Sequence, residues 1–294
     1  MILATATLDG FVEDPGTNPM PSKVTTQKGP GWGCDSFRDV WWTAGGAQKL
    51  VPSCVPDKQG KGPYRASPVK YVPTIMNRLD AAGLSWRIYD GDMEQGGFWG
   101  ICPGLYECFN QQGTQRKNYV KGTDFIPAAK AGKLPAFSIV IPRGDQSQHG
   151  GTSMIVGDNW MSSLVKSVMD GPNWNSTAIF ITYDDCGCFY DHVKPPPGLG
   201  VRLPMVIVSP WVKPRYTDHA TASLASMLTF TEHNFGLAPL NQNDANAYDY
   251  RNSFDYNQIP LPAIDLKPNP VPKASVDRIS KSPPFESDDP NDLS

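Results

Sequence analysis

The stretch that decides the fold is AIFITYDD, residues 178–185. Its first six residues are almost entirely apolar, which predicts a strand buried on both faces. Two similar runs, AFSIVI at 136–141 and PMVIV at 204–208, lie before and after it. Near-continuous apolar strands of this kind are typical of a mainly parallel sheet that helices cover on both sides.

Helical patterns alternate with these strands. Apolar residues at helical spacing predict a helix over 75–82, which ends at Gly83 and leads into a further apolar run at 84–89. Similar stripes lie around 160–168 and from about 221 to 235. We therefore predict an α/β fold with a mainly parallel sheet, helices on both of its faces and long irregular insertions.

The insertions are two stretches without such patterns: 14–70, which is rich in Pro, Gly and Lys, and 90–125. Beyond about Pro260 the chain is dominated by Pro, Ser, Asp and Lys, which predicts a mobile tail. The expected organisation is one domain over 1–262 and a tail over 263–294.

Length and charge exclude several classes of protein. The 294 residues, 39% of them hydrophobic, are enough to bury a sizeable core. The 26 basic and 29 acidic side chains give a net charge of −3 without long runs of one sign, so charge indicates neither nucleic acid nor an anionic membrane as a partner. No stretch reaches the roughly 20 apolar residues of a transmembrane helix, and the first residues, MILATAT, lack the pattern of a signal peptide.

The six cysteines fall into three pairs of near neighbours. The pairs are Cys34 with Cys54, Cys102 with Cys108, and Cys186 with Cys188. The first two have spacings that suit disulfides, which form in oxidising compartments and therefore predict a secreted or periplasmic protein. A zinc site would need short ligand spacings that neither the cysteines nor the four histidines provide.

Chemistry is expected where strands end, because ligands of open α/β sheets bind at the carboxyl ends of the strands. Asp184 and Asp185 leave the strand at 178–183 together, and Asp191 and His192 follow a few residues later. Carboxylates near an imidazole suit a divalent metal that polarises a phosphoryl oxygen. A turn or helix cap with solvated Asp side chains explains the pair equally well.

The loop after the strand at 136–141 presents a single histidine, His149, in a Gly-rich setting. Its imidazole could bind a phosphoryl oxygen or act as an acid or base. An isolated histidine in a loop is also commonly a plain surface residue. The chain contains no G-x-S-x-G nucleophile elbow.

These residues also carry a family resemblance. The segments 176–185, 189–193, 201–213 and 231–240 resemble the signature of the bacterial phosphoesterase family that contains non-haemolytic phospholipases C and acid phosphatases, within the alkaline phosphatase superfamily. The likeness is strongest from residue 130 onward.

The resemblance implies an alkaline-phosphatase-like fold in which a Ser or Thr nucleophile attacks phosphorus beside a divalent metal. It places Asp184 and Asp185 at the metal and His149 among the catalytic residues. His192 would contact the metal ligands rather than the metal and would orient them. Oxygen ligands permit calcium, magnesium, manganese or iron, and favour zinc less.

The chain also departs from the family pattern. Members carry an early Glu-Asn pair and a Thr or Ser nucleophile shortly before the strand that residues 2–7 resemble, and neither lies within these 294 residues. The resemblance therefore implies that the N-terminal part and the nucleophile are missing from this chain. Loss of a strand would expose a sheet edge and apolar surface.

Two functions follow as hypotheses. The first is a metal-dependent hydrolase of phosphoric esters, of the phospholipase C or acid phosphatase type. The second is a non-catalytic remnant that binds phosphate or lipid headgroups, or is purely structural. The expected partner is a small phosphate ester or a phospholipid headgroup, and the sequence leaves the oligomeric state open.

Overall fold

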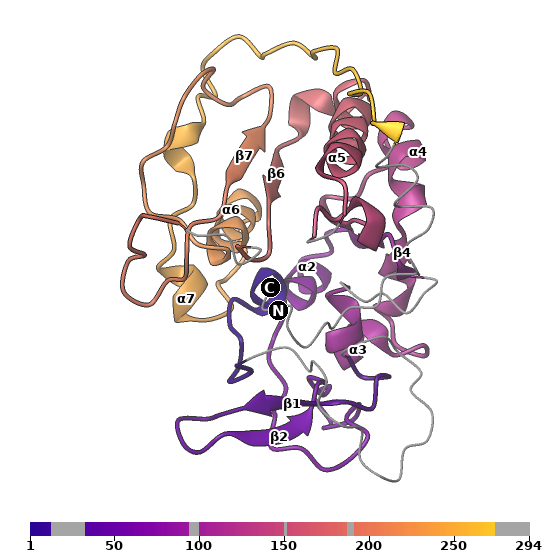
Figure 1. Cartoon of the computed structure of the whole chain (residues 1–294), viewed down its shortest axis with the longest axis vertical. Helices are drawn as coiled ribbons and strands as arrows, with labels where there is room; N and C mark the ends of the chain where they lie inside the picture. The colour runs from indigo at the N-terminus through magenta and orange to yellow at the C-terminus, as the bar shows by residue number, and fades with distance from the viewer. Residues whose placement is uncertain (13–32, 94–99, 150–151, 187–190, 274–294) are drawn as a thin grey trace.

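The strands between residues 86 and 208 form a central layer that is divided into two parts. The computed structural model describes residues 1–12, 33–93, 100–149, 152–186 and 191–273 (Figure 1). Strand β3 (Trp86–Asp90) pairs in parallel with β4 (Tyr119–Lys121) on one side and β5 (Phe137–Ile141) on the other. β6 (Ile179–Thr182) and β7 (Met205–Val208) form a separate antiparallel pair.

Helices cover both faces of this layer, which confirms the predicted α/β class. On one face lie α4 (Phe125–Lys130) and α5 (Met154–Met169), whose apolar side chains pack against Tyr89 of β3. On the other face lie α2 (Ile75–Ala81) and α6 (Ala225–Phe235). The architecture is consistent with an alkaline-phosphatase-like fold, although the runs at 178–183 and 204–208 pair antiparallel with each other rather than extending the parallel sheet.

Local signals explain where helix α2 begins and ends. Thr74 caps its N-terminus by accepting a hydrogen bond from the Asn77 amide, and the Asn77 side chain accepts from the Thr74 amide in return. Gly83, with φ of +68°, lets the chain leave the helix and turn into β3. Ile75, Met76 and Leu79 of this helix are at most 1% exposed, so the predicted apolar face is the buried one.

The first residues form a helical turn, which corrects the strand expected at residues 2–7. α1 (Ile2–Thr5) packs against α2 and α6, and Ala4 and Ala6 are buried there. Its amides bond back to Met1 and Ile2 instead of to a neighbouring strand. A short alanine-containing run has little preference for extended structure when no strand lies beside it.

The segment expected to be irregular over 14–70 contains a β-hairpin in its described part. β1 (Asp39–Trp42) pairs antiparallel with β2 (Lys49–Pro52), at the lower end of the molecule in Figure 1. Residues 13–32, including Trp32, lie outside the described part. Alternation over four residues is too short a signal to separate such a hairpin from the surrounding Pro and Gly residues.

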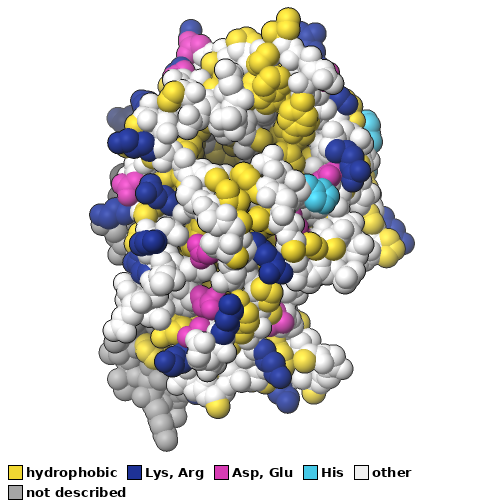
Figure 2. All heavy atoms as spheres, turned by 180° about the vertical axis from the view of Figure 1, so that it is seen from behind, with side chains coloured by type: hydrophobic (Ala, Val, Ile, Leu, Met, Phe, Trp, Pro, Cys, Tyr) yellow, Lys and Arg dark blue, Asp and Glu magenta, His cyan; other side chains and the backbone are white. Residues whose placement is uncertain are grey.

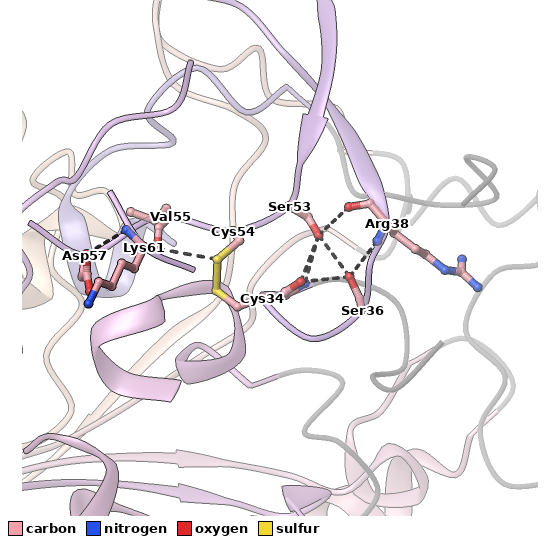
Figure 3. Close-up of a disulfide and its surroundings, with 9 residues drawn as sticks. Cys34, Ser36, Arg38, Ser53, Cys54, Val55, Asp57 and Lys61 are labelled. Atoms are coloured by element: carbon pink, nitrogen blue, oxygen red, sulfur yellow. Dashed lines mark hydrogen bonds between the residues drawn. A yellow bond between two sulfur atoms is a disulfide. The ribbon is translucent and has the colours of Figure 1, made fainter. Parts of the chain in front are cut away.

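The predicted disulfide Cys34–Cys54 fixes this hairpin to the segment before it (Figure 3). Its two Cα atoms are 4.6 Å apart. Beside it, the buried Ser53 hydroxyl accepts a hydrogen bond from the Gly33 amide at 3.0 Å, and the Ser36 hydroxyl donates to the Gly33 carbonyl at 2.9 Å. The pairing predicted from spacing is therefore confirmed, and polar groups next to it are satisfied internally.

The second expected insertion, 90–125, also contains regular structure. It holds β4 and α3 (Tyr106–Phe109), and the disulfide Cys102–Cys108 joins the start of this region to α3 with Cα atoms 5.2 Å apart. The three residues of β4 are too few to give a periodic signal, so the sequence analysis missed the third strand of the parallel sheet.

The described part of the expected tail lies against the domain. Just before the tail, the indole N–H of Trp174 donates to the Leu261 carbonyl at 3.1 Å, and Leu266 of the tail packs into the apolar cluster that includes α5 side chains. Further along, the Asn269 amide donates to Asn159 of α5 at 2.7 Å. A short helix, α7 (Gln242–Ala245), completes the fold. None of the described helices is long and apolar enough to cross a membrane.

Candidate active site

The carboxyl ends of β5 and β6 meet at one place. The Tyr183 hydroxyl, directly after β6, donates a hydrogen bond to Oε1 of Gln148 in the loop after β5. The Gln148 amide group in turn donates to the Met154 carbonyl at the start of α5, at 2.8 Å. Gly157 makes this arrangement possible, because a Cβ at that position would overlap the Gln148 side chain. Gln148 and Tyr183 thus position both loops, a role that the sequence analysis missed.

The same loop holds His149 in place through its backbone. The His149 amide donates to the Ser147 hydroxyl at 3.1 Å, and its carbonyl accepts from the Thr152 hydroxyl at 2.8 Å. Gln148, just before it, adopts a left-handed conformation with φ of +63°. A non-glycine residue rarely adopts this conformation unless neighbouring contacts hold it.

Asp184 and Asp185 follow Tyr183 at the end of β6, so the predicted carboxylate pair lies beside the loop that carries His149. Asp184 and Asp185 are both exposed residues, although neighbouring protein partly buries the Asp184 carboxylate. This burial raises the pKa of Asp184, and the charge of Asp185 adds to the shift. Backbone hydrogen bonds and the nearby His149 act in the opposite direction. The structure therefore brings three predicted site residues together.

A second set of carboxylates supports the loop after β5 from the end of β3. Asp92 accepts a hydrogen bond from the Gly144 amide at 2.8 Å, and Asp90 accepts from the Tyr119 hydroxyl at 2.6 Å. Asp90 is 1% exposed, and burial raises its pKa. These groups tie the carboxyl end of β3 to the start of β4 and to the loop after β5 that carries His149.

His192, the residue expected to orient the metal ligands, is 80% exposed and makes a different contact. Its Nδ1 lies 4.0 Å from an oxygen of Asp191. Asp191 also accepts two hydrogen bonds from Arg202, at 2.8 and 2.9 Å, and this pairing lowers the pKa of Asp191 to about 2. The role predicted for His192 stays a prediction, since residues 187–190 lie outside the described part.

The fit of this site to a metal ion is partial. Asp184 and Asp185 offer the oxygen ligands that divalent metals accept, with one imidazole nearby. Within the described residues, however, no group of three or more His, Cys, Asp or Glu side chains is arranged to hold a metal. The described donors therefore do not make up a complete metal site.

A cavity of about 370 Å³ lies at the opposite end of the parallel sheet. The residues that line it include the start of β3, Lys117 and Lys133. It lies at the amino ends of β3 and β5, away from His149 and Asp184, so we do not assign the candidate chemistry to it.

Comparison with known proteins identifies the family of the chain. Residues 39–238 match the Phosphoesterase family, and the match includes β3 to β7 and the candidate site. Because this match covers more than half of the chain, the protein belongs to the Phosphoesterase family.

Individual relatives are phospholipases. Phospholipase C A of Mycobacterium tuberculosis is 26% identical over an alignment of 234 positions, which covers 66% of this chain and 43% of the relative. Non-hemolytic phospholipase C of Burkholderia pseudomallei is 27% identical over 55% of this chain and 32% of its own. Non-specific phospholipase C6 of Arabidopsis thaliana is 32% identical over 30% of this chain and 22% of its own. The match thus spans less than half the length of each relative.

Proposed function

We propose that this chain forms part of a phosphoric ester hydrolase whose catalytic centre lies at the carboxyl ends of β5 and β6. The observation that carries the proposal is the position of His149 beside Asp184 and Asp185, within the region that matches the Phosphoesterase family. The phospholipase C relatives suggest a small phosphate ester or a phospholipid headgroup as the substrate.

In this proposal His149 binds or protonates a phosphoryl oxygen, and its loop geometry keeps the imidazole at the carboxyl edge of the sheet. The N-terminus of α5 follows the loop, and its partial positive charge favours an anion at the same edge. Asp184 and Asp185 would hold one side of a divalent ion, whether calcium, magnesium, manganese, iron or zinc. When bound, such an ion neutralises charge that develops on the phosphoryl group.

The test is hydrolysis of para-nitrophenyl phosphate and para-nitrophenyl phosphorylcholine, with each of these metals and with a chelator. When the chain is assayed together with polypeptide that supplies the expected Ser or Thr nucleophile, we expect turnover that falls about 100-fold or more in Asp184→Asn and in His149→Gln. The matched control is Asp170→Asn, which changes an exposed carboxylate at the far end of α5 that pairs with Lys166. Equal loss in the control would contradict a specific role for Asp184.

A second function is favoured by the incomplete set of metal donors among the described residues. In that case the chain binds phosphate or a headgroup without turnover. Calorimetric titration with inorganic phosphate separates the two, because binding that Asp184→Asn or His149→Gln alters, with no hydrolysis of either substrate, supports the binding role. Neither turnover nor binding would contradict both proposals.

We also propose that the protein acts in an oxidising compartment, secreted or periplasmic. The two disulfides support this location. Their presence in protein purified from that compartment, shown by mass spectrometry with and without reductant, tests it.

A further inference from the structure

The two parts of the strand layer lie side by side without being hydrogen-bonded to each other. At the carboxyl ends, Tyr183 after β6 bonds to Gln148 after β5. At the amino ends, the Asn173 side chain before β6 donates to the Gly132 carbonyl before β5 at 3.2 Å. β5 and β6 therefore run in the same direction and are joined at both ends, yet no ladder connects them.

The same helices cover β5 and β6 on both faces. Val140 of β5 and Ile179 of β6 pack into one cluster with α5. On the opposite face, Phe180 of β6 packs on Phe230 of α6 with ring centroids 4.9 Å apart, and Ile139 of β5 packs against the cluster to which α6 contributes. The space between the strands is thus bounded by the edges of β5 and β6 on two sides and by α5 and α6 on the two faces.

The facing edge of β5 is open. The Phe137 amide donates to the Ser85 carbonyl beside β3 at 3.1 Å, so alternate residues from Phe137 onward bond toward β3. In a parallel strand the residues between them, Ser138 and Val140, direct their N–H and C=O groups to the other side.

Residues of the layer are more exposed at this point than in β3. All four residues of β6 and the first four of β5 are only half-buried, although helices cover both strands. Figure 2 shows a hollow with a hydrophobic floor in the upper half of the molecule, the half that contains β6, β7 and α5 in Figure 1. Adjacent strands lie about 4.8 Å apart, so one strand between β5 and β6 would separate them by roughly 10 Å.

We infer that the gap between β5 and β6 is a docking site for one apolar β-strand from polypeptide outside residues 1–294. The incoming strand is apolar on both faces, because α5 lies on one side and α6 on the other. The length of the relatives supports this source for the strand. The matches cover only 43% and 32% of two relatives, so these relatives contain polypeptide that the present chain does not match. A strand parallel to β5 would end between His149 and Asp184. The inference rests on strand edges and burial and holds whether or not the site is catalytic.

The probes are overlapping 15-residue fluorescent peptides that cover the part of M. tuberculosis Phospholipase C A outside its match with this chain. Fluorescence anisotropy with the full 294-residue chain should find binding concentrated in peptides with an apolar run of about five residues. Ser138→Pro removes the open-edge N–H and should weaken binding at least tenfold. Ser138→Ala, the matched control, keeps that N–H and should bind like the original chain.

Two further measurements keep the inference open to contradiction. Circular dichroism compares the folding of Ser138→Pro with that of Ser138→Ala. If Ser138→Pro does not fold, N-methylation of the peptide within its apolar run tests the same hydrogen bonds from the other partner, and unchanged binding would overturn the inference. Absence of any bound peptide would also overturn it. Light scattering provides a further test. A dimer of the chain that becomes a monomer in Ser138→Pro would overturn the inference, because the gap would then accept a second copy of the chain.

Discussion

Strands β3 and β6 both contribute apolar side chains to the core of the protein but have different surroundings. β3 pairs on both sides, and its residues Trp86, Ile88 and Tyr89 are at most 2% exposed. β6 pairs on one side only, and each of its residues is half-buried. The difference teaches that covering helices alone do not bury a strand, because hydrogen-bonded neighbours in its own layer must also exclude water.

The largest effect on stability is expected in β3, the strand that pairs on both sides. Ile88→Ala removes a fully buried side chain from β3 and leaves a cavity that its neighbours cannot fill, so we expect a loss of about 2–5 kcal/mol of unfolding free energy. Urea denaturation followed by tryptophan fluorescence measures it. A loss below about 1 kcal/mol would mean that β3 is not the packed centre.

The next largest effect is expected in helix α6, which covers the strand layer, and it concerns how stability depends on pH. Glu232 of α6 is 2% exposed, and burial, with Asp244 beside it, raises its pKa to about 8. The folded state therefore keeps a proton that the unfolded chain releases near its ordinary pKa of 4.5, so stability falls as pH rises from about 4.5 to 8. The lowered pKa of Asp244 acts below this window.

Glu232→Gln should remove this pH dependence. The free energy of unfolding of the variant, relative to that of the original chain, should be on the order of 2 kcal/mol more favourable at pH 8 than at pH 5. Urea titrations of both proteins at pH 5, 6.5 and 8 test the prediction. Parallel curves for the two proteins would show that Glu232 does not titrate as described.

A third prediction concerns single amides within β5. Phe137 donates toward β3, whereas Ser138 and Val140 face the gap. Their amide hydrogens should exchange with deuterium about tenfold faster than that of Phe137, a difference of about 1.4 kcal/mol in protection. Residue-resolved exchange by NMR gives the comparison, and equal protection of neighbouring amides would indicate a closed edge.

The smallest effect is expected in β6. Ile181→Ala removes a half-buried side chain, so we expect a loss of about 1 kcal/mol, well below that for Ile88→Ala. The same urea titration measures it. A loss as large as that of Ile88→Ala would contradict the difference between the two strands.

Much of the fold could be predicted because its strands are apolar runs and its helices are periodic. The helix at 75–82 was also bounded by readable signals, with Gly83 at its end. The strands β1, β2 and β4 escaped detection because they are three or four residues long and mix polar with apolar residues, which gives neither a period nor a continuous apolar run. Pairing is a property of distant segments, so the antiparallel arrangement of β6 and β7 had no local signal.

The candidate site was predicted in part for a similar reason. The rule that ligands bind at the carboxyl ends of strands pointed to His149, Asp184 and Asp185 without knowledge of the contacts between them. The link between Gln148 and Tyr183 joins residues 35 positions apart and depends on the left-handed backbone at Gln148. Neither residue type nor spacing indicates such a contact.

The Cys34–Cys54 disulfide has a consequence for how the protein tolerates damage. Residues 44–50, at the turn of the β1–β2 hairpin, are exposed and include Lys49, where a trypsin-like protease can cut. The bond spans that position, so a chain cut there remains one covalent molecule of almost unchanged mass. Such a molecule would separate into two fragments only after reduction, and until then the hairpin strands would stay attached to the domain that they cover.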